Sequence, residues 1–421
     1  MSDQINSTLG ELVAAGGGII HTGPFGSQLH AADYVSEGIP CIMPANMKDN
    51  RVNLSGIAFI SDDDAKRLSK YLVQEGDIVY SRRGDVTAKA LIGINEVGYF
   101  CGTGCLLLRP GEKFDSNYLT YYLSTPRIQA WIISQAVGAT MPNLNTGILF
   151  RIPFTGPEKP IQEKISATLR SIDDKIDLNN RINAELEAMA KTLYDYWFVQ
   201  FDFPDANGKP YKTSGGKMEY NATLKRKIPV GWEVNNIGSI VRTELGGTPS
   251  TAINDYWKDA SIPWLSSAET ATFPVISSEQ MVTQSGIDNS AATLLPKGTV
   301  VISIVRYIRP SILGIDAATN QSVVGIMENE KFKSAFIYPY FCREIPRLMG
   351  LRTGAQQPHI NKGTIDDSPI VIPPSDILAD YYKVADAIFE KIMIQAFQSY
   401  ELIKLRDWLL PLLMNGQVTV K

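Results

Sequence analysis

Residues 157–203, PEKPIQEKISATLRSIDDKIDLNNRINAELEAMAKTLYDYWFVQFDF, decide the fold of this chain. Apolar side chains recur there at steps of mostly three and four residues: Ile161, Ile165, Leu169, Ile172, Ile176, Ile182, Leu186, Met189, Leu193 and Trp197. This spacing predicts one helix with a continuous apolar stripe, and a rise of about 1.5 Å per residue makes it roughly 58 Å long. A stripe on so long a helix needs a partner that covers it.

A second segment near the C-terminus supplies that partner. After Pro373-Pro374-Ser375 the pattern returns at Tyr381, Val384, Ile388, Ile392, Leu402, Leu405, Leu409 and Leu412. A shift of 216 positions places Ile172 on Ile388 and Leu193 on Leu409, so the two helices are repeats of each other. The shift also places Asn179 on Gln395. These amides either lie in the interface between the two paired helices, where they fix its register, or face solvent beside an apolar stripe that is wider than usual.

The segments before the two helices are also repeated. Gly76-Asp77-Ile78-Val79-Tyr80-Ser81 is matched by Gly298-Thr299-Val300-Val301-Ile302-Ser303, and residues 138–147, GATMPNLNTG, by residues 354–363, GAQQPHINKG. We therefore expect two α+β target domains, each followed by a long helix, with the two helices paired as a coiled coil. The expected boundaries are 1–157, 158–203 for the first helix, 204–228 for a Gly/Pro-rich surface linker, 229–373, and 374–421 for the second helix.

Within each domain the pattern predicts buried strands joined by a polar turn, at 77–81 and 90–94 in the first and at 300–305 and 312–315 in the second. Helical spacing covers 118–137 and 338–351, although Pro339 and Pro346 are expected to break up the latter. The loops that connect these elements are polar. Because binding residues are concentrated on surface loops, we expect them there.

Composition excludes several classes of protein. The formal net charge is −4, which argues against a nonspecific polyanion binder but permits local basic patches. No apolar run reaches the roughly 18 residues of a membrane span, and the N-terminus does not resemble a secretory signal, so a cytoplasmic protein with four reduced cysteines is expected. We found no phosphate-binding loop, HExxH or GxSxG motif, which favours a binding protein without a catalytic, metal or cofactor site of its own.

The candidate DNA-contacting residues lie in repeated loops. In the first domain they are Arg82, Arg83 and Lys89 in the turn after the first strand, with Ser27, Gln28, Thr140, Asn143 and Asn145; in the second they are Arg306, Tyr307, Arg309, Thr251, Gln356, Gln357, His359, Asn361 and Lys362. Arg reads guanine, amides and hydroxyls bond base edges, and Lys meets phosphate. Alternatively, the arginines pair with Asp77 or Asp85, and the polar loop residues merely cap the following helices.

In combination, several stretches resemble the specificity subunits of type I restriction–modification systems. They are residues 76–85 (GDIVYSRRGD), Cys101-Gly102-Thr103-Gly104-Cys105, residues 197–204, Gly208-Lys209-Pro210-Tyr211-Lys212, Ile228-Pro229-Val230-Gly231-Trp232, and residues 410–416 (LPLLMNG). The two helix starts, at Glu158-Lys159-Pro160 and Pro373-Pro374-Ser375, only approximate the pattern of that family. The resemblance spans the whole chain.

This resemblance implies a sequence-specific DNA-recognition subunit in which each domain reads one half of a bipartite target and the two helices pair antiparallel as a spacer. It also implies two methylation subunits and further restriction (translocase) subunits as partners, which carry S-adenosylmethionine, ATP and Mg²⁺. Apolar side chains near the helix ends are candidates for the subunit contacts: Tyr194, Trp197, Phe198, Leu410 and Leu413.

Two other readings stay open at this point. A self-contained DNA methyltransferase or nuclease would need an adenine pocket of the type [DNS]PP[YFW], and the nearest string, Ile372-Pro373-Pro374-Ser375, ends in Ser. A coiled-coil scaffold protein would leave the duplicated polar loops unexplained.

Overall fold

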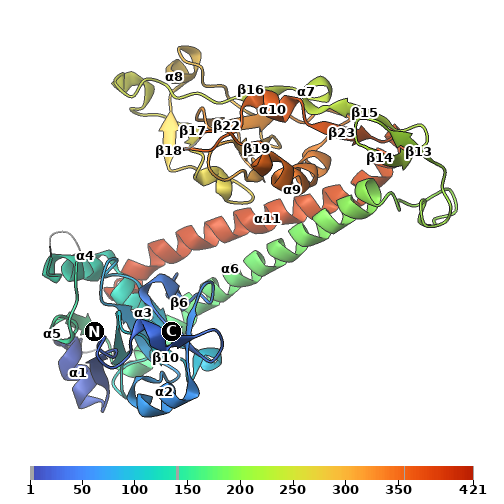
Figure 1. Ribbon diagram of the computed structural model, residues 1–421. Helices are drawn as coiled ribbons and strands as arrows, with labels where there is room; N and C mark the ends of the chain where they lie inside the picture. The colour runs from blue at the N-terminus through green and yellow to red at the C-terminus, as the bar shows by residue number, and fades with distance from the viewer. Residues whose placement is uncertain (1–3, 139–141, 355, 421) are drawn as a thin grey trace. The chain divides into compact units, whose positions relative to one another are not determined.

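The computed structural model describes residues 4–138, 142–354 and 356–420 (Figure 1). The chain folds as two units, one formed by Met1–Lys175 with Leu402–Lys421 and the other by Ile176–Glu401. Each unit therefore contains one α+β domain and parts of both long helices. The predicted class, two repeated α+β domains each followed by a long helix, is confirmed.

The first long helix, α6, spans Lys159–Tyr194, and the second, α11, spans Ser375–Met414. α6 closes with a π-helical turn at Asp195–Val199 instead of running on to 203, and α11 continues through Pro411. In the first unit their facing parts are joined by Arg406, whose Nη1 donates to Asp173 Oδ1 at 2.9 Å. Asp173, Asn179 and Asn183, taken in order along α6, contact Arg406, Gln398 and Ile392, which follow one another backwards along α11, so the two helices run antiparallel.

In the second unit the amides of the helix pair are buried. Asn179 is fully buried and Gln395 is 5% exposed, so the solvent-facing alternative is wrong. The Asn179 Nδ2 donates to Gln398 Oε1 at 3.0 Å, and the Asn183 Nδ2 donates to the Ile392 carbonyl at 3.1 Å. The Oδ1 atoms of both asparagines are buried without a hydrogen-bond partner among the described residues. A polar layer of this kind costs stability and favours one register of the seam.

The two domains share one sheet topology. The main sheet of the first has the order β2-β11-β8-β9, and that of the second has the order β16-β22-β19-β20. The bounds are β2 Ile19–Thr22, β8 Ile78–Ser81, β9 Lys89–Leu91, β11 Cys105–Arg109, β16 Thr243–Leu245, β19 Val300–Ser303, β20 Pro310–Ile312 and β22 Val323–Ile326. Every residue of β8 and β19 is buried, as their continuous apolar runs predict.

Smaller sheets and short helices complete each domain. The small sheets are β10-β4-β7-β3 in the first domain and β18-β17-β21 in the second; β1 pairs with β12 and β15 with β23, and β5 pairs with β6 in a hairpin. The strand bounds are β1 Ile5–Thr8, β3 Tyr34–Val35, β4 Ile39–Ile42, β5 Met47–Lys48, β6 Arg51–Val52, β7 Ala58–Ile60, β10 Phe100–Cys101, β12 Pro153–Gly156, β15 Glu233–Asn236, β17 Ile262–Leu265, β18 Gln280–Val282, β21 Ala318–Thr319 and β23 Pro369–Ile372. The short helices are α1 Leu9–Ala15, α2 Asp62–Arg67, α5 Thr146–Phe150, α7 Ile237–Ile240, α8 Gln284–Asp288 and α10 Lys362–Asp366.

The helices of the two domains differ from the predicted ones. The predicted helix 118–137 is two helices, α3 Ser116–Ser124 and α4 Pro126–Gln135, because Pro126 begins a new one. Conversely, α9 spans Ser334–Gly350 and continues through Pro339 and Pro346. Pro339 has no N–H for the Ala335 carbonyl four residues back, and the Tyr381 hydroxyl donates to that carbonyl instead, at 2.9 Å.

The expected surface linker 204–228 contains ordered structure. β13 (Met218–Asn221) and β14 (Arg226–Pro229) form an antiparallel hairpin. Before the hairpin, the Tyr211 ring stacks on Phe203 with 4.7 Å between centroids, and Phe203 stacks on Trp232 at 5.0 Å. Aromatic packing therefore fixes a segment whose Gly, Pro and Ser content indicated an irregular connection.

Candidate nucleic-acid interface

In the first unit the turn after β8 is joined to the loop that precedes α5. Arg83 and Asn143 form an antiparallel bridge, and the Leu144 N–H donates to the Arg82 carbonyl at 2.9 Å. The Asn143 backbone also exchanges two hydrogen bonds with Val137, at 3.0 and 3.1 Å. The two loops that the sequence singled out separately therefore form one surface.

The second unit repeats this arrangement. His359 bridges both Val305 and Thr353, and the Ile360 N–H donates to the Ile304 carbonyl at 3.0 Å, as Leu144 does to Arg82. Gly138 and Gly354 begin the paired loops at φ angles of 119° and 97°, a region that favours glycine. A shared backbone thus carries different side chains in the two copies.

Several of the predicted contact residues are exposed on these surfaces. Arg83, Arg306, Tyr307, Arg309, Gln356, Gln357 and His359 have exposed side chains. Arg309 lies over the Tyr307 ring, with Cζ 5.3 Å from its centroid. Asp77, one expected partner of the arginines, instead accepts two 2.7 Å bonds from Arg109, and Asp85 accepts from Thr87. Among the described residues no carboxylate pairs with Arg83, so its guanidinium is available to a ligand.

Arg82 is packed more deeply. Its Cζ lies 5.8 Å from the Phe25 ring centroid, and its Nε is buried without a hydrogen-bond partner among the described residues. Phe25 brings the 23–30 loop next to the arginine turn, with Ser27 exposed. The Gln28 Oε1 accepts from the Tyr71 hydroxyl at 3.0 Å and from the Phe25 N–H at 3.2 Å. The Gln28 amide thus holds the loop in place.

Three candidates have structural roles on the helix starts. The Asn145 Oδ1 accepts from the Ile148 N–H and caps α5, and the Asn361 Oδ1 accepts from the Thr364 N–H and caps α10, both at 2.9 Å. The Lys362 Nζ pairs with Asp366 at 2.8 Å. For Asn145 and Asn361 the capping alternative is therefore the one observed. Thr140 lies outside the described residues, and Thr251 is exposed before a 3₁₀ turn at Asn254–Tyr256.

Lys89 is not on the surface. It begins β9 and faces Tyr80 across the sheet, with its Nζ 5.8 Å from the Tyr80 ring centroid and only 3% of the residue exposed. Burial lowers the pKa of the Lys89 ammonium from 10.5 to about 8. The negative charge of Asp85 acts in the opposite direction and raises this pKa by a smaller amount. The expectation of an exposed phosphate contact overlooked that Lys89 belongs to the strand.

The aromatic side chains proposed for subunit contacts are also buried. Tyr194, Trp197 and Phe198 are at most 6% exposed, because the last residue of α6 and the π-helical turn that follows it both pack into the core of the second unit. The Phe198 ring lies 4.9 Å from Phe336, and Trp197 lies 5.6 Å from Tyr381. Leu413 is buried and Leu410 half-buried in the first unit. Leu413 still lines a pocket of about 790 Å³ together with Ile161, Ile165, Met414 and Val420.

Sequence reasoning missed two residues of these surfaces. Phe25 supports Arg82, and the Arg352 Nη1 donates to the Arg306 carbonyl at 2.6 Å and holds the second arginine turn. The Gly-Pro-Phe-Gly string at 23–26 is a signal that could have revealed Phe25, since Gly and Pro favour a surface turn and the turn carries a single aromatic ring. No comparable signal marked Arg352, since its partner is a backbone carbonyl distant in sequence.

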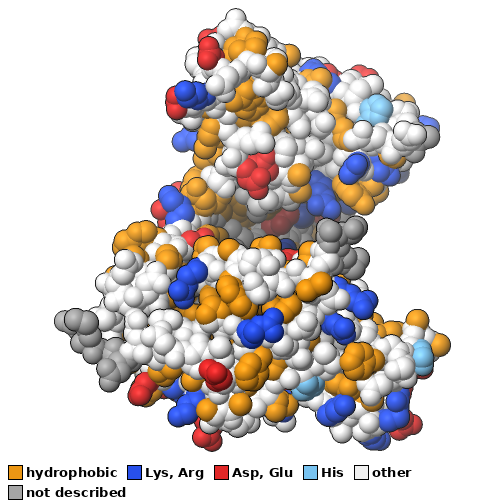
Figure 2. Space-filling view, turned by 90° about the vertical axis from the view of Figure 1, so that its left-hand side faces the viewer, with side chains coloured by type: hydrophobic (Ala, Val, Ile, Leu, Met, Phe, Trp, Pro, Cys, Tyr) orange, Lys and Arg blue, Asp and Glu red, His pale blue; other side chains and the backbone are white. Residues whose placement is uncertain are grey.

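Charged side chains are spread over the face shown in Figure 2. Lys and Arg side chains form several separate groups there, some of them next to Asp and Glu side chains. Within the described ranges, no group of three or more His, Cys, Asp or Glu side chains could hold a metal ion. The same residues contain no helix that is both long and apolar enough to cross a membrane.

Comparison with known proteins identifies the family. A family model described as the type I restriction modification DNA specificity domain matches residues 8–188 and again 229–403. The type I restriction enzyme MjaIX specificity subunit of Methanocaldococcus jannaschii is 26% identical over 92% of this chain and 89% of its own length. The HindI specificity subunit of Haemophilus influenzae is 21% identical over 83% and 88%.

A solved structure shares the fold. The type I restriction–modification S subunit from M. genitalium matches with a TM-score of 0.57 at 15% identity, covering 98% of this chain and 96% of that one. The family model accounts for both copies of the repeat, including the arginine turns and the loops paired with them. The chain therefore belongs to the family of type I restriction–modification DNA specificity subunits.

Proposed function

We propose that this chain reads a bipartite DNA target, one half with the surface around Arg83 and the other with the surface around Arg306. One observation carries the proposal: the same hydrogen-bonded pair of loops occurs in both units, with different exposed side chains. A common backbone fixes the geometry, and the side chains it presents set which bases are accepted. Two different sets of side chains then specify two different half-targets.

The chain itself is proposed to be non-catalytic. Two methylation subunits would bind it and supply the S-adenosylmethionine chemistry, and restriction subunits with ATP and Mg²⁺ would join that complex in the cytoplasm. The apolar pocket lined by Ile161, Ile165 and Leu413 in the first unit supports a partner contact near the base of the helix pair.

The test is selection of bound DNA from a random-sequence library by the chain co-purified with methylation subunits. We expect enrichment of two short defined blocks separated by several unread base pairs. The control is the methylation subunits purified without this chain, which should enrich no sequence. One uninterrupted block, or no enrichment by the full complex, would contradict the proposal.

A further inference from the structure

The first unit displays an aromatic ring beside its arginine turn. The ring belongs to Phe25, which is 54% exposed. The Gln28 and Leu29 N–H groups both donate to the Phe25 carbonyl, at 2.8 and 3.3 Å. The Gln28 carbonyl in turn accepts from the Arg67 Nη2 at 3.1 Å. Hydrogen bonds to the backbone therefore hold the loop in the conformation that presents the ring to solvent.

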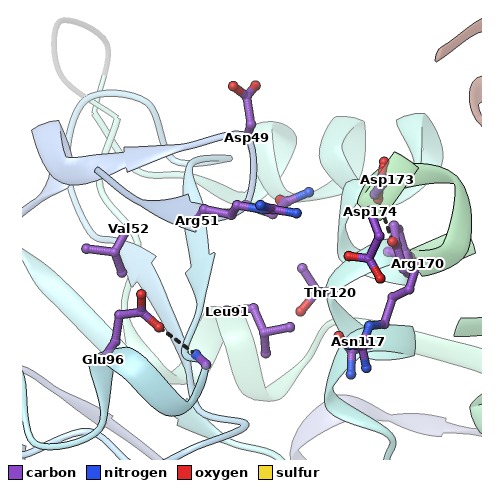
Figure 3. Close-up of a pocket in the computed structure, with 13 residues that line it drawn as sticks. Asp49, Arg51, Val52, Leu91, Glu96, Asn117, Thr120, Arg170, Asp173 and Asp174 are labelled. Atoms are coloured by element: carbon purple, nitrogen blue, oxygen red, sulfur yellow. Dashed lines mark hydrogen bonds between the residues drawn. The ribbon is translucent and has the colours of Figure 1, made fainter. Parts of the chain in front are cut away.

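Arg82 covers part of this ring and has no carboxylate partner. Its Cζ lies over the ring, 5.8 Å from the centroid, and its guanidinium donates no hydrogen bond to another described residue. Other arginines of the same unit are placed differently. Arg51 and Arg170 lie among aspartate side chains in a pocket of about 470 Å³ (Figure 3). Arg82 and Phe25 instead form a pair whose free side faces solvent.

The internal repeat identifies what replaces Phe25 in the second unit. Gly23 and Gly246 are equivalent, since each donates its N–H to the carbonyl of the first residue in the neighbouring strand, β11 or β22, at 2.9 and 3.0 Å. Two residues further on, Thr248 therefore stands where Phe25 stands in the first unit. The Thr248 hydroxyl donates to Gln321 Oε1 at 2.6 Å, so this position is polar in the second unit.

The arginine is replaced as well. Ile304 is the counterpart of Arg82, because each carbonyl accepts a backbone N–H from the paired loop, from Ile360 at 3.0 Å and from Leu144 at 2.9 Å. The shared backbone thus forms with Thr and Ile at these two positions, and the fold does not require the aromatic ring or the guanidinium. Aromatic rings and arginines are the side chains that carry most binding energy at interfaces. The pair is therefore a candidate for ligand contact.

The chemistry of the ring selects what it contacts on DNA. A Phe side chain forms no conventional hydrogen bond, and the apolar group that base pairs display in the major groove is the C5 methyl of thymine. Insertion of the ring between two base pairs would need both of its faces free, and Arg82 lies over one of them. The exposed side of the Phe25 ring is accordingly suited to a methyl group.

We infer that Phe25 is a specificity-determining residue, which contacts the methyl group of one thymine in the block read by the first domain, beside the base that Arg82 contacts. The inference rests on the proposed function, since it needs a DNA target of which this domain reads one block. The second domain, with Thr248 and Ile304 at the equivalent positions, has no such ring.

The first experiment is genome-wide methylation mapping in cells that express the complete complex with Phe25→Ala, Phe25→Leu, Arg82→Ala or Leu54→Ala. Leu54 is the matched control, since it is also 54% exposed in the first unit and no hydrogen bond among the described residues joins its turn to the arginine turn. We expect Phe25→Ala to admit other bases at one thymine of one block. Phe25→Leu, which keeps an apolar side chain, should retain most of the preference, and Leu54→Ala should leave the motif unchanged.

The second experiment removes the methyl group from the DNA instead of the ring from the protein. In a duplex that carries the mapped target, deoxyuridine replaces that thymine and lacks only the C5 methyl. Binding by the wild-type complex should weaken about fourfold, the effect of withdrawing one methyl group from an apolar contact. Binding by the Phe25→Ala complex should be almost the same on both duplexes, because its methyl contact is already lost.

Equal losses with deoxyuridine in the two complexes would overturn the inference. So would wild-type binding that is unaffected by deoxyuridine at every thymine of the block, a result that depends on no variant. If Phe25→Ala relaxes only the position that Arg82→Ala relaxes, Phe25 positions Arg82 and the methyl contact is refuted. A wild-type complex whose methylation motif lacks two defined blocks would instead refute the proposed function.

Discussion

At the scale of single residues, the burial of Lys89 predicts a pH dependence of stability. The folded state lowers its pKa from 10.5 to about 8, so the unfolded chain holds this proton more tightly. Between these pH values unfolding takes up a proton, and the contribution of Lys89 makes the free energy of unfolding rise with pH. Below pH 8 the buried charge costs about 3 kcal/mol, at 1.36 kcal/mol per pKa unit.

Lys89→Met should remove that cost. We expect the variant to be more stable than wild type by about 2–3 kcal/mol at pH 7, with the difference shrinking toward pH 10.5 as wild-type Lys89 loses its proton. Urea unfolding of both proteins at pH 7 and pH 10 measures this. A stability difference that is the same at both pH values would show that the ammonium is not buried.

The two capping asparagines also give a residue-scale test. Asn145→Ala or Asn361→Ala should lower the free energy of unfolding by about 1 kcal/mol, whereas Ser at either position should retain the cap and most of the stability. Because each side-chain oxygen already accepts from a backbone N–H, the Ser variants should keep the wild-type DNA target. Thermal unfolding and selection from random DNA are the two measurements. A changed target in a stable Ser variant would mean that the amide reads a base.

At the scale of elements, the sequence predicted the long helices and the strands β8 and β19 well because their apolar patterns are long or continuous. The strands expected at 90–94 and 312–315 were misplaced, since β9 ends at Leu91 and β20 ends at Ile312. Proline was a less reliable guide. Pro126 separates α3 from α4, whereas Pro339 lies inside α9, where the Tyr381 hydroxyl binds the carbonyl that the proline cannot. That compensation comes from a residue more than forty positions away, so local sequence did not reveal it.

Contacts between residues distant in sequence also decided which predictions about the candidate site failed. The repeat alone pointed to the arginine turns and to the loops at 138–147 and 354–363, since both recur in the same order. The burial of Lys89, and that of Trp197 in the second core, depended on strand register and on a π-helical turn. A cluster of apolar residues in a sequence indicates that these side chains are buried against other atoms. Whether those atoms belong to the same domain or to a partner subunit depends on the tertiary packing, which the sequence did not show.

At the scale of the whole molecule, the helix pair is expected to set the unread gap of the target. Matched insertion of one heptad in α6 after Asn180 and in α11 at the facing position near Gln395 lengthens the pair by about 10 Å and keeps the stripe nearly in phase, with about 20° of drift. We expect the gap to grow by about one to three base pairs, at about 3.4 Å per pair, while both blocks keep their sequence. Methylation mapping of the insertion variant is the measurement. An active variant with the original gap would show that the helices do not set the spacing.

The most direct test of two-domain recognition is genome-wide methylation mapping in cells that express the complete complex with wild-type chain, Arg83→Ala or Arg306→Ala. Both arginines are exposed in equivalent turns, and loss of a base-edge Arg should cost about 1–3 kcal/mol and relax one base position. We predict a wild-type motif of two blocks, of which Arg83→Ala relaxes only one and Arg306→Ala only the other. Both variants relaxing the same block, or neither changing the motif, would contradict the assignment of one half-target to each domain.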